Sequence, residues 1–68
     1  MNFNPVDFVS NFIRLSTMNK DNYNYVTGLL EAFKLTNSIS LSDYNRLMCF
    51  AGQSYFESYL KSLSDSKE

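Results

Sequence analysis

The stretch that decides the fold is residues 39–44, Ile39-Ser40-Leu41-Ser42-Asp43-Tyr44. An apolar residue precedes a serine, a polar residue follows three positions later, and an aromatic residue comes directly after it. In this pattern the serine side chain accepts hydrogen bonds from the free amides of a first helical turn, and the flanking apolar residues close over that turn. The pattern also occurs at residues 3–8 (Phe3-Asn4-Pro5-Val6-Asp7-Phe8) and 18–23 (Met18-Asn19-Lys20-Asp21-Asn22-Tyr23). The sequence therefore predicts an all-α fold of three helices.

The spacing of apolar residues predicts the extent of each helix. Apolar side chains recur at intervals of three and four, which is typical of helices with one buried face. We expect helices over about residues 5–16, 20–35 and 41–63, with antiparallel neighbours because the polar link at residues 36–38 is short. The third helix is the longest, at about 35 Å for a rise of 1.5 Å per residue. Residues 1–63 are expected to form a single compact domain, and residues 64–68 a frayed polar tail.

Composition limits how this fold can be stabilised. A chain of 68 residues has a small core, and it lacks the usual reinforcements, since there is one cysteine and no histidine. An intramolecular disulfide is impossible, and a zinc site would lack its usual ligands. The chain nevertheless contains six Phe and five Tyr. Eleven rings are difficult to bury in one small core, so self-association, most commonly as a symmetric homodimer, is expected.

Catalytic machinery is missing from the sequence. There is no histidine to act as general base, the seven carboxylates form no pair spaced for one cleft, and the two glycines form no phosphate-binding loop. Cys49 is the strongest nucleophile, but no cation is predicted beside it, so we interpret it as structural or incidental. The sequence thus predicts a protein that is not an enzyme, with no cofactor, no metal and no small-molecule substrate.

Hydropathy and amino-acid composition predict the compartment and the type of source organism. No apolar run approaches the roughly 20 residues of a membrane span, and no signal sequence precedes the first helix. We therefore expect a soluble, cytoplasmic protein with no membrane contact. Asn, Lys, Tyr, Phe and Ile, whose codons are AT-rich, supply 25 of the 68 residues. This bias is typical of a low-GC bacterium or of its phages and mobile elements.

The C-terminal half of the third helix is apolar on more than one side. At 100° per residue, a core stripe is formed by Tyr44, Leu47, Met48, Ala51, Tyr55 and Tyr59, whereas Phe56, Leu60 and Leu63 lie roughly 100–160° away from Tyr44 and Phe50 lies on the opposite flank. Two shorter helices can cover only one side of this helix, so the remainder is a candidate interface. The predicted partner-binding residues are Phe50, Phe56, Tyr59, Leu60 and Leu63.

An alternative is that the third helix breaks near Gly52. Residues 53–63 would then fold back as a fourth short helix, and the same apolar residues would belong to the core.

These features predict a small non-catalytic protein-binding module, such as an adaptor, inhibitor or regulator, that binds a protein partner or itself. The alternative function is a small dimeric helix-turn-helix regulator that binds DNA. The third helix would then be the recognition helix. Asp43 at the helix start would repel phosphates, and the acidic sequence pI of 5.2 also disfavours nucleic acid. The candidate DNA contacts are Ser42, Asn45, Arg46 and Gln53.

Overall fold

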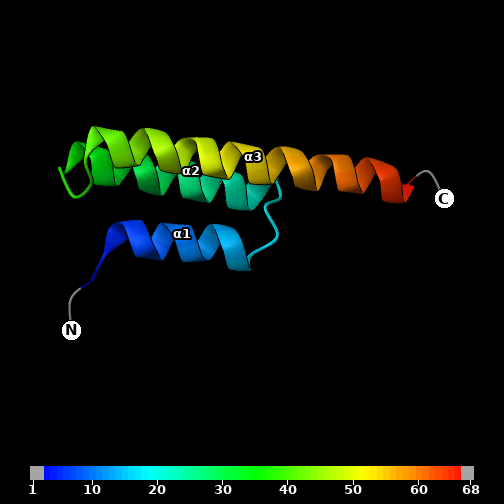
Figure 1. Cartoon of the computed structure of the whole chain (residues 1–68), viewed down its shortest axis with the longest axis horizontal. Helices are drawn as coiled ribbons and strands as arrows, with labels where there is room; N and C mark the ends of the chain where they lie inside the picture. Colours follow the sequence, from blue (N-terminus) through cyan, green and yellow to red (C-terminus); the bar gives the residue numbers. More distant parts are fainter. Residues whose placement is uncertain (1–2, 67–68) are drawn as a thin grey trace.

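Three α-helices make up the fold: α1 (Pro5–Leu15), α2 (Lys20–Leu35) and α3 (Leu41–Ser66). The computed structural model describes residues 3–66, and side-chain burial for residues 3–64. The helices lie side by side, with α1 and α3 running in one direction and α2 in the other (Figure 1). The predicted all-α, three-helix architecture with the longest helix third is confirmed.

The first cap begins α1 as predicted. The Asn4 Oδ1 atom accepts hydrogen bonds from the amides of Val6 at 3.0 Å and Asp7 at 3.2 Å. The rings of Phe3 and Phe8 lie on either side of this turn, with their centroids 5.7 Å apart. This arrangement is a hydrophobic staple, which fixes the direction in which the chain enters the helix.

The other two caps have the same chemistry. The Asn19 Oδ1 atom accepts from the Asn22 amide at 2.8 Å, and the Ser40 Oγ atom accepts from the Asp43 amide at 3.0 Å. Each bond satisfies one of the first-turn amides that lack a partner inside the helix. The starts of all three helices are therefore set by local side-chain hydrogen bonds.

A tight turn ends α2 and reverses the chain. Asn37 adopts a left-handed conformation with φ of 60°. The Ser38 amide donates to the Phe33 carbonyl at 2.8 Å, and the Asn37 amide donates to the Lys34 carbonyl at 3.1 Å. These two bonds form a Schellman motif, which satisfies carbonyls at the end of α2. The turn lets α3 return antiparallel to α2.

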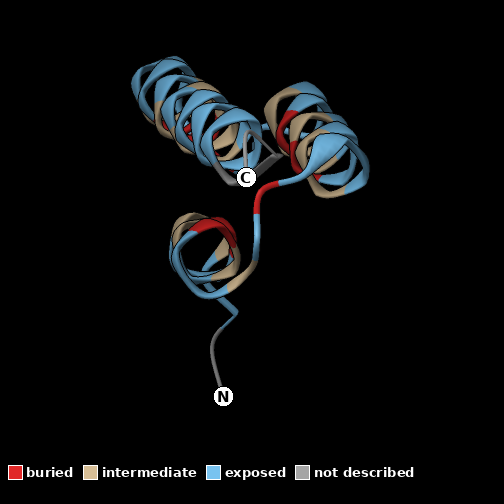
Figure 2. Ribbon diagram, turned by 90° about the vertical axis from the view of Figure 1, so that its right-hand side faces the viewer, coloured by how far each residue is buried: buried red, intermediate tan, exposed pale blue. Residues whose placement is uncertain are grey.

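The core lies between the three helices and is entirely apolar. Figure 2 shows the buried positions facing the centre of the bundle. Both links contribute one residue to it, Met18 before α2 and Ile39 before α3. Among residues 3–64, no polar or charged residue is buried. The buried residues are Val9, Ile13, Met18, Val26, Leu30, Ile39, Leu47 and Ala51.

Three predicted boundaries differ from the structure. The first helix ends at Leu15, and Ser16 is its C-cap instead of its last residue. The third helix does not break near Gly52 and continues to Ser66. Residues 64–66, predicted as part of the polar tail, continue the helix, because no glycine or proline interrupts the backbone bonds after Leu63. Residues 67–68 of the predicted tail lie outside the described residues.

The extra length of α3 makes the molecule elongated. Its dimensions are 45 × 23 × 17 Å and its radius of gyration is 13.2 Å. A compact chain of this length has a radius of gyration of about 11 Å. The C-terminal part of α3 extends past the ends of both other helices (Figure 1).

Candidate functional site

The candidate site is the part of α3 that extends beyond the bundle. Tyr55 is stacked on Tyr23 of α2, with centroids 4.7 Å apart and planes inclined by 15°. After this pair only Ser58 is even partly buried among residues 56–64. We call residues 56–66 the overhang, which is about 16 Å long at 1.5 Å per residue.

Four large apolar side chains lie together on the overhang. The exposed fractions are 59% for Phe56, 55% for Tyr59, 47% for Leu60 and 43% for Leu63. Their spacing of three and four residues places them on one side of the helix. We call these four residues the apolar face. Four of the five predicted partner-binding residues are thus brought together on one exposed surface.

Phe50 does not belong to this surface. It is half-buried and packs against the hydrophobic core. This core contains residues of all three helices, and the buried stripe on α3 is wider than the one predicted from the sequence. Phe50 therefore contributes to packing of the bundle.

The apolar face continues toward the middle of α3 as a surface of small residues. Cys49 is exposed and its thiol is free. Gly52 is partly buried, but a Cβ atom added there would have nothing within 4 Å. Space beside the backbone at Gly52 is therefore open to a second molecule.

Charged side chains of α3 lie away from this surface. Arg46 and Glu57 are roughly 80° and 100° round the helix from Phe56, and Asp43 and Lys61 are roughly 140° away. The centre of the apolar face therefore carries no charged side chain between residues 43 and 63, and Glu57 borders the face beside Leu60.

A cavity of about 310 Å³ lies at the base of the overhang. The link before α2 forms one wall, with the fully buried Met18 among its residues. The other wall comes from α3, and it includes Tyr59 of the apolar face. The sequence did not reveal this cavity, because its two walls are distant in the chain. Its lining residues are Thr17, Met18, Asn19, Tyr55, Ser58, Tyr59 and Ser62.

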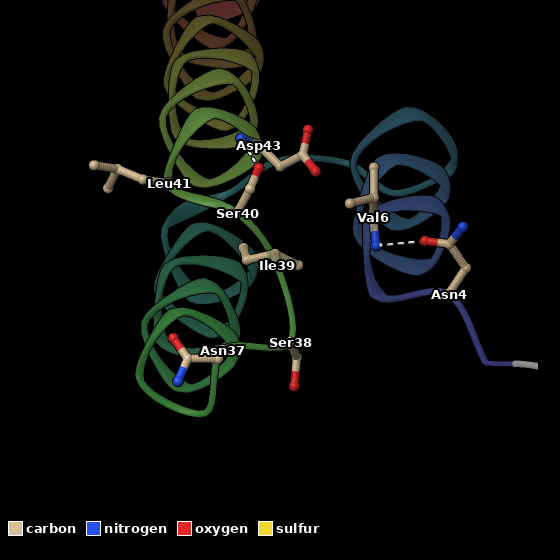
Figure 3. A pocket seen from close by; sticks show the side chains of 8 residues that line it. All are labelled: Asn4, Val6, Asn37, Ser38, Ile39, Ser40, Leu41 and Asp43. Carbon is tan, nitrogen blue, oxygen red and sulfur yellow. Dashed lines mark hydrogen bonds between the residues drawn. The ribbon is translucent and has the colours of Figure 1, made fainter.

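A second, wider depression lies at the opposite end of the bundle. It is formed by the start of α1, the turn after α2 and the start of α3 (Figure 3). Its polar groups include Asn4 and Ser40, whose side-chain oxygens already accept the capping hydrogen bonds. We therefore assign this depression to helix capping.

Close to this end, Tyr44 of α3 is anchored to α2. Its hydroxyl donates to the Glu31 Oε2 atom at 2.8 Å, and the Lys34 Nζ atom lies 4.3 Å from the centre of its ring. The hydrogen bond to Glu31, then desolvation and the charge of Glu31, raise the pKa of Tyr44 above its ordinary value of 10.0. Lys34 and Glu31 also form an ion pair at 3.8 Å. The cluster links α2 to α3.

The four candidate DNA-contact residues share an exposed part of α3. Ser42, Asn45, Arg46 and Gln53 are all exposed. The Arg46 guanidinium, however, is paired with Asp43 at 2.8 Å. In a helix-turn-helix the two helices cross at about 90–120°, whereas α2 and α3 form an antiparallel hairpin (Figure 1). DNA binding stays a prediction that this helix arrangement does not favour.

Nowhere in residues 3–66 do three His, Cys, Asp or Glu side chains gather closely enough to hold a metal ion. None of the helices in that range combines the length and the hydropathy needed to cross a bilayer.

No protein-family model, curated protein or solved structure matches this chain. The candidate site therefore depends on the geometry described above.

Proposed function

We propose that this chain is a small non-catalytic protein-binding module, an adaptor, inhibitor or regulator, that binds through the apolar face of the overhang. The observation that carries the proposal is the exposure of Phe56, Tyr59, Leu60 and Leu63 on one side of a helix that extends past its own bundle. Soluble monomers seldom expose contiguous apolar patches of this kind except where they bind another molecule.

The chemistry of the face defines the partner. Because no charged residue between positions 43 and 63 lies at the centre of this face, the matching surface should also be mainly apolar. Phe56 and Tyr59 are the expected anchors, since aromatic side chains dominate interface energetics. The cavity beside Tyr59 adds a recess that a partner side chain can enter.

The test combines Phe56→Glu with Leu60→Glu and compares this variant with Lys61→Glu. Both variants lower the formal net charge by two, but Lys61 lies on the opposite side of the overhang. Each is used to capture binding proteins from a bacterial lysate, with bound proteins quantified by mass spectrometry. We expect the double variant to lose the captured proteins and Lys61→Glu to retain them. Helicity and the midpoint of thermal unfolding should be unchanged in both variants.

Two results would contradict the proposal. Equal capture by the double variant and the wild type would show that the face is not the binding surface. A large loss of helicity in the double variant would place Phe56 and Leu60 in the core, and there would be no free apolar face.

A further inference from the structure

We infer that the apolar face is occupied by a second copy of this chain, with the two α3 helices antiparallel and a two-fold axis passing beside Phe56. The inference rests on the proposed function and specifies the partner. Symmetric dimers with one self-complementary surface are the commonest protein assemblies.

The residues before and after Phe56 on α3 are complementary in size. Leu60 lies four residues after Phe56 and Gly52 lies four residues before it. Leu63 and Cys49 are likewise related, seven residues to either side. When two antiparallel α3 helices are related by a two-fold axis beside Phe56, Leu60 therefore lies against Gly52 of the other copy. Leu63 likewise lies against Cys49 of the other copy.

These residues also share one side of α3. Cys49, Gly52, Phe56, Leu60 and Leu63 fall within an arc of roughly 80° at 100° per residue. Their separations of three and four residues are typical of the seam between two packed helices. The open space beside Gly52, where an added Cβ would meet nothing within 4 Å, is the position that Leu60 of the second copy would fill.

A parallel pair fits less well. It would place Leu60 against Leu60 and Gly52 against Gly52, so one layer would be crowded and the other would leave a void. Voids and overpacking both weaken an interface. In the antiparallel pair each contact along the seam combines one leucine with one small residue, so the side-chain volume is similar at both contacts.

Charge permits the association of identical copies. No charged residue between positions 43 and 63 lies on the seam itself, and Glu57, one position from the two-fold axis, flanks the seam at roughly 100° from Phe56. The formal net charge of −1 also means that two copies repel each other only slightly.

The area of free surface suits a weak dimer. The molecule exposes 5033 Å², whereas a folded monomer of 7.9 kDa is expected to expose about 4,400 Å². The excess of roughly 600 Å² approaches the ~800 Å² that each partner buries in a standard interface. We therefore expect a weak and reversible dimer.

The experiment introduces a second thiol by Leu63→Cys and oxidises the purified chain. In the inferred pair the new thiol lies beside Cys49 of the other copy, so covalent dimers should form at least tenfold faster than in Lys61→Cys, whose new thiol is on the opposite side. The two positions in one helix are about 21 Å apart, so they cannot form an internal disulfide. The wild type should not be crosslinked through Cys49, because the two copies of this residue are equally far apart.

Sedimentation measurements test the same interface without crosslinking. Gly52→Arg should raise the dissociation constant at least tenfold, because the new side chain occupies the space of Leu60 from the second copy. Gly28→Arg is the matched control, since an added Cβ at Gly28 of α2 also meets nothing within 4 Å. Its dissociation constant should equal that of the wild type.

Contrary outcomes separate this inference from the proposed function. Rapid crosslinking of the wild type through Cys49 would overturn the antiparallel register. A monomer at millimolar concentration, with no accelerated crosslinking in Leu63→Cys, would overturn self-association. In either case loss of lysate proteins from the Phe56→Glu, Leu60→Glu variant would still support binding of a different partner by the apolar face.

Discussion

Tyr23 of α2 and Tyr55 of α3 stack with their ring centroids 4.7 Å apart, and after this pair only Ser58 is partly buried among residues 56–64. One turn later Tyr59 is 55% exposed. Two tyrosines four residues apart on one helix therefore have different environments. Their difference marks where the bundle ends and the overhang begins.

Substitution of these tyrosines should separate packing from binding. Tyr55→Ala removes the stacked ring and part of the core edge, so we expect a loss of about 2 kcal/mol in the free energy of unfolding. Tyr59→Ala should change it by less than about 0.5 kcal/mol because the side chain is largely exposed. Urea denaturation followed by circular dichroism gives both values. Similar losses in the two variants would show that the overhang is packed against the bundle.

The two glycines should be sites of simple stabilisation. Both lie inside helices, and an added Cβ at Gly28 or Gly52 has nothing within 4 Å. Alanine is favoured over glycine in a helix interior by about 1 kcal/mol, so each Gly→Ala change should raise the free energy of unfolding by roughly 0.5–1 kcal/mol. Thermal unfolding at low micromolar concentration, where the chain is monomeric, measures the effect. A decrease at Gly28 would indicate a close neighbour that the structure lacks.

The turn after α2 should be sensitive at Asn37. Its φ of 60° is unfavourable for residues with a Cβ atom, and asparagine tolerates it better than most. Asn37→Ala should therefore cost about 1 kcal/mol, whereas Asn37→Gly should leave stability unchanged within about 0.5 kcal/mol. Chemical denaturation of the two variants checks this order. If alanine were tolerated as well as glycine, the left-handed turn would not be needed to end α2.

Alkaline pH should weaken the link between α2 and α3. The hydrogen bond to Glu31, followed by desolvation and the charge of Glu31, raises the pKa of Tyr44 in the folded chain. As pH rises past 10.0, the unfolded chain loses this proton first, so the native state then binds more protons. The contribution of the Tyr44–Glu31 hydrogen bond to the free energy of unfolding is complete below pH 10.0. It is lost as pH rises through the raised pKa of Tyr44. Ultraviolet titration of the tyrosinate band should show the pKa of Tyr44 falling toward its ordinary value in Glu31→Gln.

The variant Tyr44→Phe tests whether the change in the titration curve comes from Tyr44. In Tyr44→Phe, introduction of Glu31→Gln should leave the tyrosine titration curve unaltered. A remaining shift would mean that Glu31 acts on a different tyrosine.

Duplex DNA provides the test of the alternative function. The candidate contact Arg46 is paired with Asp43, and the hairpin of α2 and α3 lacks the crossing angle of a helix-turn-helix. We expect no binding to random duplex at low salt, measured by fluorescence anisotropy. Binding with a steep dependence on salt concentration would instead support a DNA-binding regulator, because it reports release of counterions from phosphates.

Prediction from sequence succeeded best where structure is local. A cap depends on a side chain and amides two or three residues away, so Asn4, Asn19 and Ser40 could all be identified as helix starts. Helix ends were less accurate, because the end of α3 has no comparable signal. Phe56, Leu60 and Leu63 could also be grouped from helical spacing alone, but the same spacing placed Tyr59 at the edge of the core stripe, and the structure leaves it 55% exposed.

The environment of the same residues depended on the neighbouring helices. Phe50 and Phe56 are both apolar residues outside the predicted core stripe, yet Phe50 packs against the core and Phe56 is 59% exposed. The difference arises because Phe50 lies in the part of α3 that packs against the core, whereas Phe56 lies on the overhang. No residue pattern within α3 contains that information.

The amino-acid sequence by itself determined that this protein forms three helices and where each begins, because caps and apolar periodicity act over a few residues. Only the tertiary structure decided that α3 is unbroken at Gly52, that its last residues extend past the bundle, and that Thr17 and Tyr59 line one cavity. These properties depend on how far one helix reaches along another, and that reach is set by packing between residues distant in the chain.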